Sequence, residues 1–317
     1  PTGDVNDPYY WISNRDDPDT IAYLEAENQH CEDWFAPHAE VVEGLFNEIK
    51  SRIQETDESV PTLKDGWWYA TRTEEGSQYP IHCRGASRET ATATAILDEN
   101  LLADGHEYFS LGAFDISPDT HLLIWSSDTD GSEHFTMRIR DLRTGTDLTD
   151  EIEDTSWAGT AWSADSKFIF YVTYDEQERP STVWRHEIGT SQKQDVQVFD
   201  EPDERFYVGI DLTRSGAWIV IDADSKTSSE TRLISASNPF SEPIIVRARQ
   251  DDLEYHIDHW GDRFIVLTND SAIDFRIMQA PESQPSEWTE LVAHIEGNRI
   301  TRADCFATHI VIHEWVN

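Results

Sequence analysis

Three serines lie in short glycine-containing segments that invite comparison with a nucleophile motif: Ser87 in RGASRE, Ser132 in DGSEH and Ser215 in TRSGAW. In many serine hydrolases a G-x-S-x-G turn between a strand and a helix exposes the reactive hydroxyl. None of the three segments has two glycines at that spacing. We therefore expect no catalytic serine among these 317 residues.

The segment SDTDGSEH resembles a calcium-binding loop because Asp128 and Asp130 are two residues apart and precede Gly131. An EF-hand loop requires three spaced oxygen ligands before its glycine and a bidentate glutamate at position twelve. Counting from Ser126, position twelve is Met137. A polar hairpin between two strands is the better interpretation.

Two histidine-containing segments also resemble metal sites. HEWVN, residues 313–317, begins like the zinc motif H-E-x-x-H, but Asn317 replaces the second histidine and the context is a strand. In YHIDHW, alternation along a strand places His259 on the opposite face from His256 and Asp258. We expect a hydrogen-bonded strand histidine there, and the sequence predicts neither a metal nor a cofactor.

The charge balance is strongly acidic. With 24 basic and 62 acidic residues, the formal net charge is −38. Such a surface repels nucleic acids and anionic membranes, so we expect neither as a partner. The acids are spread along the chain, which favours an adaptation to solubility or high salt, while steering of cationic substrates is the alternative.

The expected compartment is the cytoplasm. No run of 18 apolar residues predicts a membrane span, and no basic region followed by an apolar stretch marks a signal peptide, although the sequence begins with proline and an earlier segment could have been removed. Cys31, Cys83 and Cys305 show no C-x-x-C spacing, which argues against a disulfide scaffold or a zinc site.

The elements that must position these residues change in kind near residue 60. Asp17 and Pro18 predict the start of a helix, and Pro37 separates it from a second one. Apolar residues recur at helical spacing in both: Ile21, Leu24, Cys31, Trp34 and Phe35 in the first, and Val42, Leu45, Phe46, Ile49 and Ile53 in the second. Both stripes need a partner surface.

From Val60 onward, short apolar runs follow turn signals at regular intervals. Their central residues are 55, 45, 50, 46 and 46 positions apart, namely Trp68, Leu123, Phe168, Trp218, Phe264 and Ile310. Each run is followed by a polar hairpin, an alternating strand and a short closing strand. This period predicts a mainly β fold, a β-propeller of four-stranded blades, with a β-solenoid as the alternative.

The repeat provides five units and the opening of a sixth, about five and a half blades, and stops inside an apolar strand pattern at IVIHEWVN. A domain ending there would leave an unpaired strand edge. We therefore expect the chain to be a fragment, with an N-terminal helical extension at residues 1–60 and a partial propeller at residues 61–317.

An ordered series of segments resembles oligopeptidase B, the protease II branch of the prolyl oligopeptidase family of serine peptidases. The segments are DPYYWI, YLEAEN, FNEIKSRI, VPTLKDGWWYATRTEEGSQYPIHCR, YFSLGAFDISPDTHLLIWSSDTDGSEHFTMRIRDLRTG, VWRHEIGT and EYHIDHWGDRFIVLTN. The resemblance implies a seven-bladed propeller, a helical extension and a C-terminal α/β-hydrolase domain that is absent from this chain. It also implies cleavage of short peptides after Arg or Lys.

The aromatic cluster Tyr9, Tyr10 and Trp11 gives the extension a role. Three adjacent aromatic side chains favour burial. The resemblance implies that they pack against the hydrolase domain, which would be the partner of this chain in the intact protein.

The second interpretation of the whole chain is a stand-alone propeller that binds a protein partner, and the two apolar helices argue against it. A fragment without the catalytic serine should be inactive.

Overall fold

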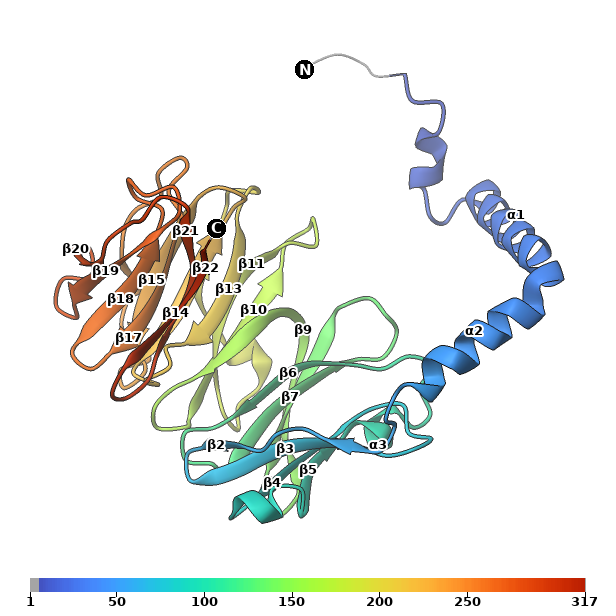
Figure 1. The fold of residues 1–317 in the computed structure, drawn as a ribbon, viewed down its shortest axis with the longest axis horizontal. Helices are drawn as coiled ribbons and strands as arrows, with labels where there is room; N and C mark the ends of the chain where they lie inside the picture. Colours follow the sequence, from blue (N-terminus) through green and yellow to red (C-terminus); the bar gives the residue numbers. More distant parts are fainter. Residues whose placement is uncertain (1–5, 317) are drawn as a thin grey trace. The chain divides into compact units, whose positions relative to one another are not determined.

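The computed structural model describes residues 6–316 and divides the chain into two compact units. The first comprises the chain up to Asp57 together with Thr73–Gly76, and the second comprises Glu58–Arg72 and the chain from Ser77 onward. Figure 1 shows helices in the first unit and β-sheets in the second. No helix among the described residues is long and apolar enough to cross a bilayer.

The first unit contains two α-helices joined by a short 3-10 segment. Its elements are η1 (Tyr10–Ser13), α1 (Pro18–Phe35), η2 (Ala36–His38) and α2 (Ala39–Ser51). The side chain of Asp17 accepts a hydrogen bond from the backbone N–H of Asp19 at 2.9 Å, and Pro18 occupies the first helical position. The predicted helix start and the predicted interruption at Pro37 are both confirmed.

The second unit consists of antiparallel sheets whose strands follow one another in chain order. The first sheet contains β1 (Asp57–Glu58), β2 (Thr62–Lys64), β3 (Trp67–Thr73), β4 (Ile81–Gly85) and β5 (Thr94–Asp98). The short helix η3 (Arg88–Thr90) lies between β4 and β5, and α3 (Glu99–Ala103) follows β5. The second contains β6 (Ser110–Ile116), β7 (Leu122–Asp128), β8 (Phe135–Asp141), β9 (Thr146–Trp162), β10 (Phe168–Tyr174), β11 (Pro180–Glu187) and β12 (Val196–Asp200), with η4 (Gln192–Gln194) before β12.

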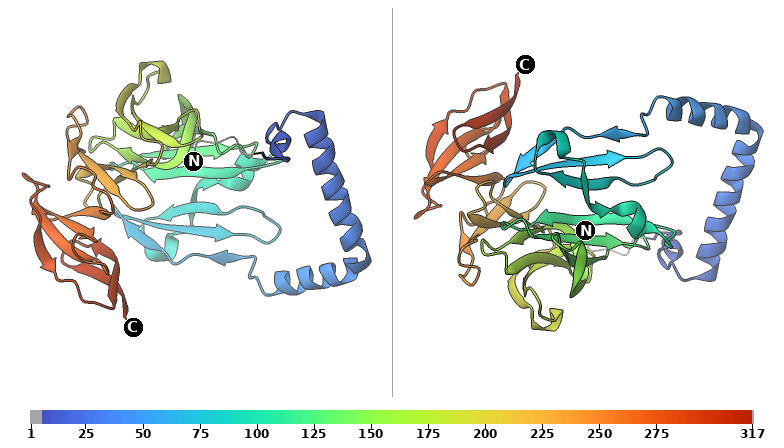
Figure 2. Two further views of the ribbon diagram at one scale, coloured as in Figure 1. Left: turned by 90° about the horizontal axis from the view of Figure 1, so that it is seen from above. Right: turned by 90° about the horizontal axis from the view of Figure 1, so that it is seen from below.

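Three further sheets complete the unit. They are β13 (Tyr207–Leu212), β14 (Trp218–Asp224), β15 (Ser229–Ser235) and β16 (Ile244–Ile245); β17 (Tyr255–Trp260), β18 (Arg263–Thr268), β19 (Arg276–Pro281) and β20 (Thr289–Val292); and β21 (Asn298–Cys305) with β22 (Ile310–Val316). The views in Figure 2 show the sheets of this unit succeeding one another along an arc, from cyan to red. This is the arrangement of propeller blades.

The seven-stranded sheet is two blades joined by one long strand. The first part of β9 pairs with β8, its last part pairs with β10, and Thr155 has a partner in each. Counting β9 in both blades gives five complete blades and the two strands of a sixth, as the repeat predicted. The continuous strand was not predicted, because the turn between these blades is replaced by a change of pairing partner.

The six residues that defined the repeat occupy equivalent places. They lie at the first or second position of β3, β7, β10, β14, β18 and β22. Each of these is the second strand of its blade, except that β3 follows both β1 and β2 and pairs with each of them. This confirms the propeller and removes the solenoid alternative.

The core is divided among the interfaces between successive blades. In β10, Ile169 and Tyr171 pack with the preceding blade, whereas Phe170 and Val172 pack with β13 and β14 of the following blade. Both faces of the strand are therefore covered, which explains its uninterrupted apolar sequence. Full burial of each such side chain stabilises the fold by roughly 1.5–3 kcal/mol.

The close approach of two blades requires a glycine at one point. Gly159 in β9 has φ +98°, and a Cβ added there would lie 2.2 Å from the carbonyl oxygen of Ile210 in β13. Only glycine fits both the backbone conformation and the space.

Candidate functional site

The first strands of the blades carry charged residues at similar positions. Four aspartates lie within the last three residues of their strands, and a lysine ends the first strand of the first blade; these are Lys64 in β2, Asp115 in β6, Asp211 in β13, Asp258 in β17 and Asp304 in β21. The pairing order places these strands at corresponding edges of their sheets. We call this set the inner-strand charges.

The inner-strand charges interact across blades. The ammonium Nζ of Lys64 lies 3.8 Å from Oδ1 of Asp115. Burial raises the pKa of Asp115 to about 6, with a further contribution from Asp211, although Lys64 acts in the opposite direction. Burial also raises the pKa of Asp211, and Asp258 adds to the effect. The carboxylates therefore repel one another around a single nearby lysine.

Arg214 partly compensates the other end of this set. Its backbone N–H donates to Oδ1 of Asp258 at 2.9 Å, and its guanidinium lies 3.8 Å from Oδ1 of Asp304. The imidazole of His313 lies 2.9 Å from the other oxygen of Asp304. His313 is thus on β22, a strand, as expected, and pairs with a carboxylate.

The serine–histidine arrangement nearest to a hydrolase triad lies at a blade turn. Oγ of Ser215 is 2.9 Å from Nδ1 of His259, whose Nε2 is 2.6 Å from Oε1 of Glu282. Oγ of Ser215 also accepts from the backbone N–H of Ala217 at 3.2 Å within the turn between β13 and β14. The turn joins two strands rather than a strand to a helix, so no helix N-terminus stands beside the hydroxyl to stabilise an oxyanion. His259 is the hydrogen-bonded strand histidine that the sequence predicted.

The calcium-like segment is a hairpin held by its own aspartate. The buried carboxylate of Asp128 accepts hydrogen bonds from the backbone N–H groups of Asp130, Gly131 and Glu133, at 2.9, 3.0 and 2.9 Å. Its oxygens are therefore used to shape the turn, as in an Asx turn. Within residues 6–316, no group of three or more His, Cys, Asp or Glu side chains could hold a metal ion.

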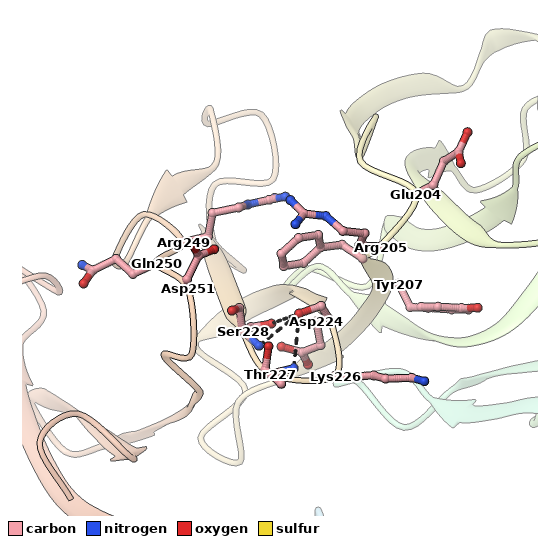
Figure 3. Close-up of a pocket in the computed structure, with 12 residues that line it drawn as sticks. Glu204, Arg205, Tyr207, Asp224, Lys226, Thr227, Ser228, Arg249, Gln250 and Asp251 are labelled. Atoms are coloured by element: carbon pink, nitrogen blue, oxygen red, sulfur yellow. Dashed lines mark hydrogen bonds between the residues drawn. The ribbon is translucent and has the colours of Figure 1, made fainter. Parts of the chain in front are cut away.

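A cavity of about 650 Å³ lies at the ends of the fourth blade's strands. Three segments distant in sequence line it, residues 204–207, 224–228 and 249–251. Figure 3 shows Asp224 between Arg249 on one side and Tyr207 and Lys226 on the other. Sequence reasoning missed this site, because the three loops carry ordinary turn residues and only the blade geometry brings them together.

The aromatic cluster of the first unit is accessible. Tyr9, Tyr10 and Trp11 are 68%, 74% and 41% exposed. Trp11 makes an edge-on contact with Tyr23, with ring centroids 5.8 Å apart. The stripe of α2 is exposed as well, at Val42, Leu45, Phe46, Ile49 and Ile53. This much apolar surface is typical of a surface that binds a partner.

The chain belongs to the prolyl oligopeptidase family. The family model described as "Prolyl oligopeptidase, N-terminal beta-propeller domain" matches residues 1–317. Among curated relatives, "Dipeptidyl aminopeptidase BI" of Pseudoxanthomonas mexicana is 34% identical over 98% of this chain and 46% of its own length. "Protease 2" of Moraxella lacunata is 33% identical over 93% of this chain and 44% of its own length. The chain thus spans about half the length of the curated relatives it matches.

Solved structures show the same similarity. Oligopeptidase B from Leishmania major superposes with a TM-score of 0.91 and 27% identity, over 97% of this chain and 44% of that one. Oligopeptidase B from Trypanosoma brucei, with covalently bound antipain in a closed form, has a TM-score of 0.89 and 30% identity, over 98% and 45%. The recognition made from sequence segments is confirmed.

Proposed function

We propose that this chain is the propeller portion of an oligopeptidase B-like serine endopeptidase, and that the intact protein cleaves short peptides after Arg or Lys. The observation that carries the proposal is the similarity to two oligopeptidase B structures over 97% and 98% of the chain. The covalent antipain adduct belongs to the Trypanosoma brucei protein and supports the serine-peptidase chemistry by analogy.

In this proposal the propeller is a gate and a scaffold. A C-terminal α/β-hydrolase domain would supply the serine that attacks the scissile carbonyl, the histidine base and the aspartate that orients it. The propeller would admit short peptides and exclude folded proteins. Residues 1–60 would form the extension, with Tyr9, Tyr10 and Trp11 packed on the hydrolase domain, and residues 61–317 the partial propeller. The proposed compartment is the cytoplasm.

The test compares the 317-residue chain with the product of the complete reading frame. The substrates are an N-terminally blocked dibasic fluorogenic peptide and a dipeptide amide with a free N-terminus, because one relative is named a dipeptidyl aminopeptidase. We expect the longer product to hydrolyse the blocked peptide, a serine-directed inhibitor to abolish this, and the 317-residue chain to show no turnover.

Two results would overturn the proposal. Inhibitor-sensitive hydrolysis by the pure 317-residue chain would place the nucleophile within it. A natural stop codon directly after Asn317, with no downstream G-x-S-x-G, would favour a stand-alone binding propeller.

A further inference from the structure

One strand crosses the joint between the second and third blades. β9 runs as a single strand of 17 residues from Thr146 to Trp162. Near its middle, the buried Thr155 pairs with Phe135 on β8 and with Thr173 on β10. Its hydroxyl Oγ1 donates to the backbone carbonyl of Phe135 at 3.0 Å. The backbone ladder is therefore continuous from one blade to the next, and no loop separates them.

Buried side chains fasten the same joint. Asp150 lies on the part of β9 that belongs to the second blade, and His186 lies on β11 of the third. Oδ1 of Asp150 is 3.0 Å from Nε2 of His186 and accepts from the backbone N–H of Gly189 at 2.5 Å. The side chains of Asp150 and His186 are 1% and 0% exposed. Opening one blade alone would remove the partner of a charged group that stays in the other blade, which is costly.

Polar contacts extend the joint toward the ends of the strands. The side-chain amide of Gln192 in η4 donates to the backbone carbonyl of Glu153 in β9 at 2.9 Å and accepts from its N–H at 3.1 Å. The hydroxyl of Tyr174, at the end of β10, donates to the backbone carbonyl of Glu133 in the β7–β8 turn at 2.9 Å. Both contacts join the second blade to the third.

An apolar cluster fills the joint from both blades. Its buried members lie on β7, β8, β9 and β10; they are Ile124, Met137, Ile139, Ile152, Trp162, Ile169 and Tyr171. Ile152 and Trp162 lie on the same strand but in different blades. Opening either blade would expose the apolar surface of the other to water.

The other joints connect separate sheets. Among the described sheets no other strand is shared, and the chain passes from sheet to sheet through residues 99–109, 201–206, 246–254 and 293–297. Side-chain pairs cross these joints as well, such as that of Arg249 with Glu201. An opening there breaks individual contacts, but it does not divide a strand.

We infer that the second and third blades form one cooperative pair, which opens and unfolds as a whole. Cooperative opening arises where the loss of one part removes buried contacts and backbone partners from another. The shared strand and the buried contacts of this joint have both effects. One consequence rests on the proposed function: a passage for peptides between blades would open at a joint other than this one. The cooperative pair itself rests only on the contacts within the joint.

The experiment measures native-state amide hydrogen exchange of the 317-residue chain by mass spectrometry. The variant Leu123→Ala truncates a fully buried side chain of β7 in the cluster shared with Leu97 of the first blade, away from the third. In a cooperative pair, this destabilisation reaches both blades equally. We expect the slowest amides of β10 and β11 to exchange faster by the same factor as those of β7 and β8, about tenfold or more.

The matched control is Leu233→Ala in β15 of the fourth blade, on the other side of the third. Leu233 is equally buried and belongs to the cluster shared with Tyr255 of the fifth blade. This variant should accelerate exchange in the fourth blade much more than in β10 and β11.

A second measurement uses the wild type alone. The slowest amides of the second and third blades should show the same dependence on urea below the unfolding transition, because this slope reports the surface exposed on opening. Three results would each overturn the inference: unchanged exchange of β10 and β11 in Leu123→Ala, different urea slopes in the two blades, or equal effects of both variants on the third blade. No step involves hydrolysis, so the inference can fail while the peptidase proposal stands, and it can hold if that proposal fails.

Discussion

Nδ1 of His186 lies 2.7 Å from Oδ1 of Asp195, and both side chains are fully buried in the third blade. On the other side of the ring, Nε2 lies 3.0 Å from Oδ1 of Asp150. Burial alone would lower the pKa of His186, but the hydrogen bonds to Asp150 and Asp195 outweigh it and raise the pKa to about 9. The ring is therefore an imidazolium at neutral pH, with both N–H groups donating.

This network predicts a loss of stability in alkali. A histidine whose pKa is raised in the folded state contributes fully below its unfolded pKa near 6.5, and its contribution disappears as the pH rises through about 9. The change amounts to on the order of 3 kcal/mol. Urea unfolding between pH 6 and pH 10 should show this loss in the wild type and a flatter profile in His186→Gln. The exposed His121→Gln is the control, and parallel profiles for all three would contradict the assignment.

The inner-strand charges predict a second loss of stability with rising pH, at lower pH and caused by the burial of a carboxylate. Because the pKa of Asp115 is raised to about 6, its contribution to stability falls as the pH rises from about 4 to about 6. Asp115→Asn should therefore stabilise the chain at pH 7 by about 1–2 kcal/mol after allowance for partial exposure, with the difference disappearing toward pH 4. Lys64→Gln should destabilise it at pH 7. Unfolding curves at both pH values test the pair, and the same sign for both variants would refute the electrostatic account.

Gly159 and Gly189 have similar φ angles, but they differ in the room available for a side chain. Their φ angles are +98° and +85°, but a Cβ at Gly159 would lie 2.2 Å from the oxygen of Ile210, while nothing lies within 4 Å of one at Gly189. Gly189→Ala should cost about 1–2 kcal/mol for the left-handed conformation. Gly159→Ala should cost at least about 2 kcal/mol more, because β9 and β13 must separate. Thermal melts that rank the two variants equally would show that this contact can relax.

The acidic surface predicts a salt-dependent melting temperature. A net charge of −38 repels itself, and salt screens this repulsion over about 8–10 Å near physiological ionic strength. Thermal melting should shift upward from low to high sodium chloride. An unchanged midpoint would remove the interpretation of the acidity as an adaptation to salt.

The exposed aromatic cluster and helical stripes predict where proteases act first. If Tyr9, Tyr10 and Trp11 belong against a hydrolase domain, residues 1–60 should be cut or should self-associate in this chain while the blades remain protected. Limited proteolysis with mass spectrometry locates the first cuts. Replacing Leu45, Phe46 and Ile49 of α2 by Gln should reduce self-association in sedimentation. First cuts within the blades, with residues 1–60 intact, would contradict the proposal.

The sequence by itself determined the propeller, because the corresponding strands of the four intervening blades, β7, β10, β14 and β18, are covered on both faces. Successive residues of these strands, such as 168–172 in β10 and 264–267 in β18, had to be apolar because they point alternately to two covered faces, and this requirement repeats with the blade. The helix start at Asp17 was equally readable, since capping is local chemistry between neighbouring residues.

Only the tertiary structure decided how distant residues meet. Asp150, His186 and Asp195 come from separate elements, β9, β11 and the loop before β12, and no local pattern relates them. The cavity around Asp224 likewise combines three loops, and the inner-strand charges become neighbours only when successive blades pack. The physical reason is that a sequence repeat specifies the pairing within a blade, whereas side-chain contacts between blades depend on how the sheets pack around their common centre.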